Sequence, residues 1–395
     1  MKSIEINLSE ARKLILAGQG LAKNKPFGRG KSGAVKALEQ LGYVQIDAIS
    51  VIQRAHHHTF WNRVGNYRPK LLYDLMAKDR KVMEYWSHAV AFLPMAHYRF
   101  CLHTMKYVSQ AGNHWYQVDP KVKNYVYDRI ANEGPLYARD FESKNKRSGA
   151  MWDLKPAKQA LHELFMEGKL LVSARDNFQR RYDLPERVLP AGIDTSTPSE
   201  KEQAAFYLLT AIKAQGLVAL GEVHYLRKWI KALILRYLPE FEEEGVVQAV
   251  RIAGDSKKIF YTTENNLQKL PKRVSKSIYF LSPFDNAIIQ RKRLQYFFDF
   301  NYQTEIYLPE HKRVYGYFAL PILWGTNFIG RLDPKADRKS DVLIVKNLQI
   351  EPHTKINKQL LGALKKALYD FATFNECHTI KVLETNLPML ADYLK

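Results

Sequence analysis

A glutamine and an aspartate stand two residues apart in the short apolar segment GYVQID, residues 42–47. Side chains alternate between the faces of a strand, so Gln45 and Asp47 would share one face while Val44 and Ile46 face the core. Aspartate is disfavoured in strands because its carboxylate competes for backbone hydrogen bonds. A solvated pair on a surface strand is one interpretation. The other is a functional site in which a carboxylate and an amide act side by side on a bound group.

Donor groups and aromatic rings follow this pair closely in RAHHHTFWNR, residues 54–63, a composition that suits a site for stacking and holding a base. Consecutive histidines in a strand would alternate faces, so at most two could bind one ion, and we expect no metal. In QRKRLQ, residues 290–295, arginines could contact phosphate or form a solvated basic face. The predicted DNA contacts are therefore Arg54, His56, His57, His58, Arg63, Arg291 and Arg293, although the three histidines could instead be structural donors whose hydrogen bonds are satisfied within the protein.

The charge balance predicts a polyanionic partner. The 395 residues include 60 Lys and Arg against 40 Asp and Glu, a formal net charge of +20. A field of this sign attracts nucleic acid, while no strongly basic amphipathic helix indicates a membrane surface. The sequence shows no signal peptide and no long apolar run, and its two cysteines cannot form a disulfide framework. We expect a soluble, cytoplasmic protein.

Several common catalytic motifs are missing from the sequence. GRGKSG, residues 28–33, lacks the spacing of a nucleotide-binding P-loop, and there is no G-x-S-x-G elbow. The H-x-E and P-C-x-x-C motifs of zinc deaminases do not occur either. We therefore expect no cofactor.

Three stretches share a helical segment, a glycine and a short apolar run: residues 34–47, 157–175 and 233–252. The glycine suits a left-handed helix cap, and the residues after the second copy predict a β-hairpin. With the helices expected upstream, this order predicts three winged helix-turn-helix units, which commonly bind DNA.

Strand-like pieces become frequent from about residue 271, and a final helix is expected over residues 357–374. The predicted fold class is α+β, with tandem winged helix-turn-helix units and a β-rich C-terminal domain. The predicted domains are residues 1–120, which include the Q-x-D motif, then 121–195, 196–270 and 271–395.

Together these blocks resemble the AlkZ/YcaQ family of winged-helix DNA glycosylases over nearly the whole chain. The resemblance rests on the N-terminal blocks around residues 8–21 and 41–63 and on the long irregular stretch 281–338. That family has Q-x-Q and Q-x-D catalytic patterns, and Gln45-Ile46-Asp47 resembles the second, YcaQ-like branch. The hairpin at residues 321–330 would correspond to a family element that approaches DNA.

The resemblance implies a DNA glycosylase that excises N-alkylated purines, chiefly N7-alkylguanine, from double-stranded DNA and unhooks interstrand crosslinks. Because no lysine is evidently placed to form a Schiff base, we expect a monofunctional enzyme. We also expect it to act as a monomer and to be a nucleoid-associated bacterial protein. Asp47 and Gln45 would be its catalytic residues, without a lyase step. The alternatives are a non-catalytic winged-helix DNA-binding protein, such as a transcription regulator, and a protein-interaction module. The last would leave the net charge of +20 unexplained.

Overall fold

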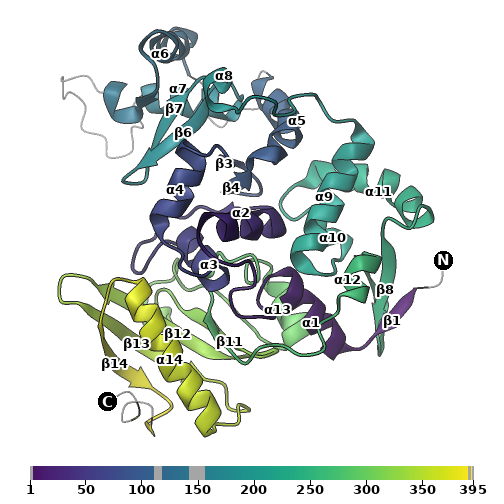
Figure 1. Cartoon of the computed structure of the whole chain (residues 1–395), viewed down its shortest axis with the longest axis vertical. Coiled ribbons are helices and arrows are strands. Elements are labelled where there is room, and N and C mark those ends of the chain that lie inside the picture. The colour runs from purple at the N-terminus through teal and green to yellow at the C-terminus, as the bar shows by residue number, and fades with distance from the viewer. Residues whose placement is uncertain (1–2, 111–117, 142–155, 390–392, 394–395) are drawn as a thin grey trace. The chain divides into compact units, whose positions relative to one another are not determined.

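The computed structural model describes residues 3–110, 118–141, 156–389 and 393. Helices and several small sheets alternate along the chain, which confirms the α+β class (Figure 1). The contacts divide the chain into two compact units: unit 1 combines residues 1–68 with 204–395, and unit 2 spans 69–203. Among the described residues, no helix is long and apolar enough to cross a membrane.

The N-terminal helices of unit 1 begin and end where local chemistry predicts. Helix α1 (Leu8–Gly18) starts with a capping box, in which Asn7 and Glu10 each accept the other's backbone N–H. Helix α2 (Gly30–Leu41) ends at Gly42, whose φ of 74° suits glycine, and strand β2 (Val44–Gln45) follows. The helix, glycine and strand predicted for residues 34–47 are confirmed, although the strand is only two residues long.

A second part of unit 1 combines helices with a three-stranded sheet in the order β1-β8-β9. Leu208, Ile234, Phe241 and Tyr261 pack in its core. Its elements are α9 (Glu200–Gln215, most of which belongs to unit 1), α10 (Leu220–Val223), α11 (Lys228–Glu243), β8 (Gln248–Ile252), β9 (Asp255–Thr262) and the N-terminal β1 (Ile4–Ile6). This succession is the one predicted for a winged helix-turn-helix unit.

The C-terminal part of unit 1 is a five-stranded sheet against which helix α14 packs (Figure 1). Strands β13 and β14 are parallel, so α14 provides the crossover between them. Its elements are β10 (Ile278–Phe280), α13 (Arg291–Phe298), β11 (Leu320–Trp324), β12 (Asn327–Asp337), β13 (Val342–Ile350), α14 (Lys358–Phe374) and β14 (Thr379–Thr385). The β-rich C-terminal region and the helix predicted over residues 357–374 are confirmed, as is the β11–β12 hairpin, but the helix is not the last element, because the unpredicted strand β14 follows it and joins the sheet.

Unit 2 has a second copy of the helix, strand and hairpin pattern. One sheet has the order β5-β7-β6 and includes the hairpin predicted after Gly168, while strands β3 and β4 pair antiparallel in another sheet. The buried Glu84 carboxylate pairs with Arg175 and Arg180. Its elements are α4 (Pro69–Ala77), β3 (Val82–Trp86), β4 (Val90–Pro94), α5 (Tyr98–Ser109), α6 (Pro120–Glu133), β5 (Leu136–Tyr137), α7 (Pro156–Met166), β6 (Leu171–Asp176), β7 (Gln179–Asp183) and α8 (Pro185–Val188).

Two local predictions were wrong. The histidines at 56–58 lie in helix α3 (Ala55–Arg63) and not in a strand. The strand-like segment EIYL, residues 305–308, lies in a loop that continues to residue 319 before β11 begins. In both places tertiary contacts override the local pattern. The boundaries of the four predicted domains stay predictions.

Candidate active site

The Q-x-D motif spans the end of a strand. Val44 is 1% exposed and Gln45 is half-buried, and β2 ends at Gln45. Asp47 therefore stands in the irregular segment that leads to α3. The expectation that both side chains project from one strand is wrong in this detail, because pairing stops before Asp47.

The Asp47 carboxylate is held by its own backbone. The Ile49 N–H donates to Asp47 Oδ1 at 2.8 Å, and the side chain remains half-buried. Among the described residues, no Lys, Arg or His forms an ion pair with it. Burial raises the pKa of Asp47 above its ordinary value, and the Ile49 hydrogen bond opposes that shift. A partly exposed carboxylate whose pKa is raised can act as a base.

The segment that follows Asp47 is anchored to the C-terminal sheet. Val51 accepts a hydrogen bond from Ala336 N–H at 2.8 Å, and Gln53 N–H donates to Asn375 Oδ1 at 2.7 Å. Ile52 is 1% exposed and belongs to the core of that sheet. These contacts position a segment without regular structure, as a catalytic loop on a rigid scaffold needs.

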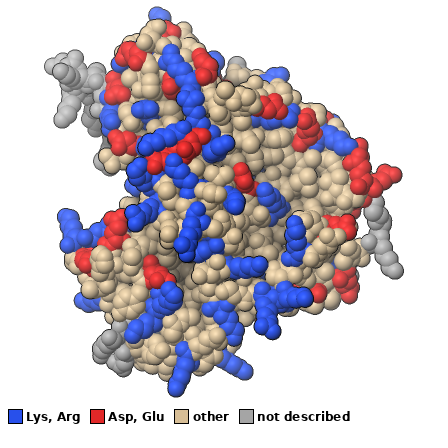
Figure 2. All heavy atoms as spheres, in the orientation of Figure 1, with Lys and Arg blue, Asp and Glu red and all other residues tan. Residues whose placement is uncertain are grey.

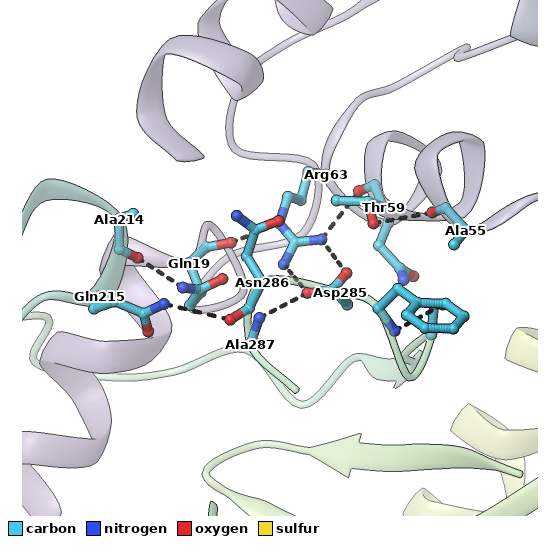
Figure 3. Close-up of polar contacts among 12 residues, drawn as sticks. Gln19, Ala55, Thr59, Arg63, Ala214, Gln215, Asp285, Asn286 and Ala287 are labelled. Atoms are coloured by element: carbon cyan, nitrogen blue, oxygen red, sulfur yellow. Dashed lines mark hydrogen bonds and ion pairs between the residues drawn. The ribbon is translucent and has the colours of Figure 1, made fainter. Parts of the chain in front are cut away.

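Arg63 was predicted to contact DNA, but it lies at the centre of a buried ion pair (Figure 3). Its Nη1 and Nη2 donate to the two Asp285 carboxylate oxygens at 2.8 and 2.7 Å, and both side chains are fully buried. Its Nε and Nη1 also donate to the backbone oxygens of Gln19 and Thr59. Because the guanidinium is enclosed by protein acceptors, we assign Arg63 a structural role.

The three predicted histidine contacts are also buried, at 0%, 2% and 0% exposure for His56, His57 and His58. His57 Nδ1 lies 2.9 Å from the Tyr67 hydroxyl. Burial lowers the pKa of His58 to about 4, so this ring is neutral near pH 7. All three side chains lie in the protein interior, where they cannot contact DNA in this structure. In the part of the chain that the structure describes, no cluster of three or more His, Cys, Asp or Glu could hold a metal.

The two arginines of α13 have different environments. Arg293 is 5% exposed, and its Nη1 lies 2.6 Å from Glu222 Oε2 while Nη2 donates to two backbone oxygens. This arginine is structural, contrary to the prediction of a DNA contact. Arg291 is half-buried, its guanidinium lies 5.7 Å from the centroid of the Tyr302 ring, and its hydrogen bonds to described residues are long, at 3.4 and 3.5 Å to backbone oxygens. Arg291 and the half-buried Arg54 stay predicted DNA contacts.

The sequence reasoning missed the role of Asp285 and Asn286. Asn286 Nδ2 donates to the Tyr43 carbonyl at 2.9 Å, directly before the Q-x-D strand, and Ala287 N–H donates to Asp285 Oδ1. The stretch 281–338 carries the family resemblance, and its Asn286 also holds the backbone directly before the Q-x-D motif. Two polar residues inside the apolar run LSPFDNAII were the available signal.

A separate cavity of about 460 Å³ lies in unit 1 between α3, β10 and α14. Lys25, Trp61 and Tyr279 are among the lining residues, which do not include Gln45 or Asp47. Burial lowers the pKa of Lys25 to about 8. We assign this cavity no part in the chemistry at Asp47.

Comparison with known proteins shows the family to which the chain belongs. The family model described as DNA glycosylase AlkZ-like matches residues 38–374, which include Gln45, Asp47 and Asp285. The chain belongs to the AlkZ-like DNA glycosylase family. Its fold is similar to that of the Streptomyces sahachiroi DNA glycosylase AlkZ, with a TM-score of 0.65 at 15% sequence identity over 96% of this chain and 100% of that chain.

Membership in the AlkZ-like family makes this chain a DNA glycosylase and DNA its partner. Lys and Arg side chains are spread over the molecular face drawn in Figure 2, in keeping with the net charge of +20. Such a surface gathers phosphates without reading sequence, so the discrimination of damage must come from the site itself.

Proposed function

We propose that this AlkZ-like enzyme is a monofunctional glycosylase that hydrolyses the N-glycosidic bond of N7-alkylguanine, with Asp47 as its catalytic carboxylate. The observation that supports this most is the state of Asp47: half-buried, fixed by the Ile49 N–H, and without an ion-pair partner among the described residues. A carboxylate neutralised by a protein cation would have little charge left for a substrate.

The chemistry required of Asp47 follows from the leaving group. An N7-alkylated guanine carries a positive charge and departs with the bonding electrons as a neutral base, so the reaction needs no general acid. The deoxyribose then resembles an oxocarbenium ion, which the Asp47 carboxylate stabilises. Water adds at C1′ and its proton passes to the carboxylate, for which the raised pKa of Asp47 is favourable.

We infer a supporting role for Gln45. Its amide cannot transfer protons usefully, but it can donate to or accept from water or the nucleotide. Its half-buried position on β2, two residues before Asp47, is suited to holding the attacking water. Loss of this amide should reduce the rate less than loss of the carboxylate.

Crosslinked purines form the second proposed substrate class. A base that is tethered to the opposite strand is difficult to flip fully into a deep pocket. A carboxylate on a partly exposed loop can reach the sugar without enclosing the base. On this basis we include the unhooking of interstrand crosslinks in the proposal, with the enzyme acting as a monomer.

Base release from a duplex that contains N7-methylguanine tests the proposal. The wild type should release the base, and Asp47→Asn should be about 10²- to 10⁴-fold slower, the range for loss of one acid–base or charge-stabilising group. Asp128→Asn removes an exposed carboxylate of α6 and should leave the rate unchanged. Equal rates for wild type and Asp47→Asn would remove Asp47 from the mechanism.

A further inference from the structure

The loop between α13 and β11 presents apolar side chains to solvent. Tyr307 is 81% exposed and Val314 is 70% exposed, the two highest values among the large hydrophobic side chains of the described residues. Exposed apolar groups close together in sequence often mark a surface that a partner covers. Tyrosine is well suited to this position because its ring stacks while its hydroxyl remains hydrated.

Two buried carboxylates accept hydrogen bonds from the backbone of this loop. Glu305 Oε2 accepts the N–H groups of Tyr315 and Gly316 at 2.9 and 3.0 Å. Asp333 accepts those of Tyr317 and Phe318 at 3.1 and 2.9 Å. Their side chains sit at 6% and 4% exposure, so these charge-assisted bonds are shielded from water.

Further contacts fix the path of the chain between the exposed residues. Gly316 has a φ of 122°, and a Cβ there would collide with the Asp333 carboxylate. Arg313 Nε donates to the Leu308 carbonyl at 2.9 Å, and Leu308 N–H donates to the Glu305 carbonyl. The exposed side chains are therefore mounted on an ordered base, and a contact through them costs little additional ordering.

The loop shares its core with the Asp47 segment. Ile306, next to Tyr307, packs on the same buried cluster as Ile49, which is hydrogen-bonded to Asp47. His311 and Lys312 are exposed in the same loop, next to the exposed Glu310, so the loop carries two potential phosphate-binding groups as well as the ring. An aromatic ring flanked by basic groups is a combination suited to contact with a nucleic-acid strand.

We propose that Tyr307 stacks on a base of the DNA duplex at the damaged nucleotide and holds the local base pairs apart while Asp47 reaches the sugar. This inference rests on the proposed glycosylase function. An apolar wedge inserted at a base step compensates for the loss of stacking and opens the duplex locally. Val314 supports the wedge by covering the adjacent base or sugar surface.

The test uses Tyr307→Ala, Tyr307→Trp and the matched control Tyr107→Ala, which removes a ring of 56% exposure on α5. Each substitution is combined with Asp47→Asn and bound to a duplex in which 2-aminopurine stands next to N7-methylguanine. The fluorescence of 2-aminopurine rises when it is unstacked, so this readout does not require catalysis. Single-turnover base release is measured in parallel with Asp47 intact.

We expect Tyr307→Ala to abolish most of the fluorescence rise and to slow base release about tenfold, in line with the loss of one stacked ring. Tyr307→Trp and Tyr107→Ala should retain both, and the Tm should not change. A full fluorescence rise with Tyr307→Ala would overturn the wedge even if the enzyme is active. Wild-type protein that unstacks the duplex but releases no base would contradict the proposed function and leave the wedge supported.

Discussion

Asp47 and Asp285 are carboxylates of the same unit in opposite environments. Asp285 is fully buried, and its two oxygens accept from Arg63 in a bidentate pair. Asp47 is half-buried, and its one hydrogen bond from a described residue is the Ile49 backbone N–H. The first carboxylate has its charge neutralised by the fold, and the second keeps a charge available for a substrate. The same residue type thus supports structure in one place and, in our proposal, chemistry in the other.

The largest loss of unfolding free energy should come from substitutions that break the buried Arg63–Asp285 pair. Asp285→Ala leaves the Arg63 guanidinium buried without its carboxylate, which costs about 3–5 kcal/mol of unfolding free energy. Urea denaturation measures this loss. Arg63→Lys should also destabilise the protein, because a lysine cannot reproduce the two parallel hydrogen bonds. Retention of wild-type stability in both variants would contradict the structural role of the pair.

The two arginines of α13 show the same difference between a charge that is paired inside the protein and one that is available to a ligand. Arg293→Gln leaves Glu222 partly buried without its ion-pair partner and should lower the unfolding free energy by about 3 kcal/mol.

Arg291→Gln should leave the Tm nearly unchanged and weaken DNA binding. It should also reduce the slope of log affinity against log salt by about 1, if this side chain contacts one phosphate. Titrations of a duplex at several salt concentrations check this, and an unchanged slope would remove Arg291 from the interface.

Asn286 connects the two regions of the comparison. Asn286→Ala removes the partly buried hydrogen bond to the Tyr43 carbonyl and should cost about 1 kcal/mol, the typical net contribution of one hydrogen bond. The Q-x-D strand begins one residue later, so the rate of base release should fall while the affinity for DNA stays the same. Thermal denaturation and single-turnover kinetics on the same preparation separate the two effects. A rate that stays at the wild-type value in the folded variant would show that this support is not needed for catalysis.

The smallest expected effect is the change in Tm when the charge of Asp47 is removed. Its pKa is raised in the folded protein, so its protonated form contributes stability at low pH. That contribution is lost as the pH rises through the raised value, and at neutral pH the charged carboxylate is a cost. Asp47→Asn keeps an oxygen for the Ile49 N–H and should raise the Tm at pH 7 by about 1–2 °C. A lower Tm would show that the charged form is stabilised by the fold.

Sequence reasoning succeeded where local chemistry decides the structure. Gly42 and Gly168 mark helix ends because they adopt a left-handed conformation that few other residues accept, and the apolar runs of the C-terminal region form its sheet. It failed for the histidines at 56–58, which were interpreted as strand residues and lie buried in a helix. Their partners, such as Phe371, come from a helix more than 300 residues away, which no local pattern reveals.

Only part of the candidate site could be predicted from the sequence, because some of its residues have partners that are distant along the chain. Gln45 and Asp47 were found through their short spacing and through the resemblance. Arg63 was placed at the DNA because a basic residue amid histidines and aromatics suggests a nucleic-acid surface. Its actual partner, Asp285, is 222 positions away, and only the folded chain brings the two together.

The central claim is that the ionised Asp47 carboxylate drives release of the damaged base, and the rate of that release as a function of pH tests it most directly. Single-turnover release of N7-methylguanine should be followed from pH 4 to pH 8 for the wild type and for Asp47→Asn. The wild-type rate should fall toward acid with an inflection above the ordinary aspartate pKa of about 3.9, and the variant should be slow and insensitive to pH over this range. The same acid limb in Asp47→Asn at a comparable rate would contradict the claim.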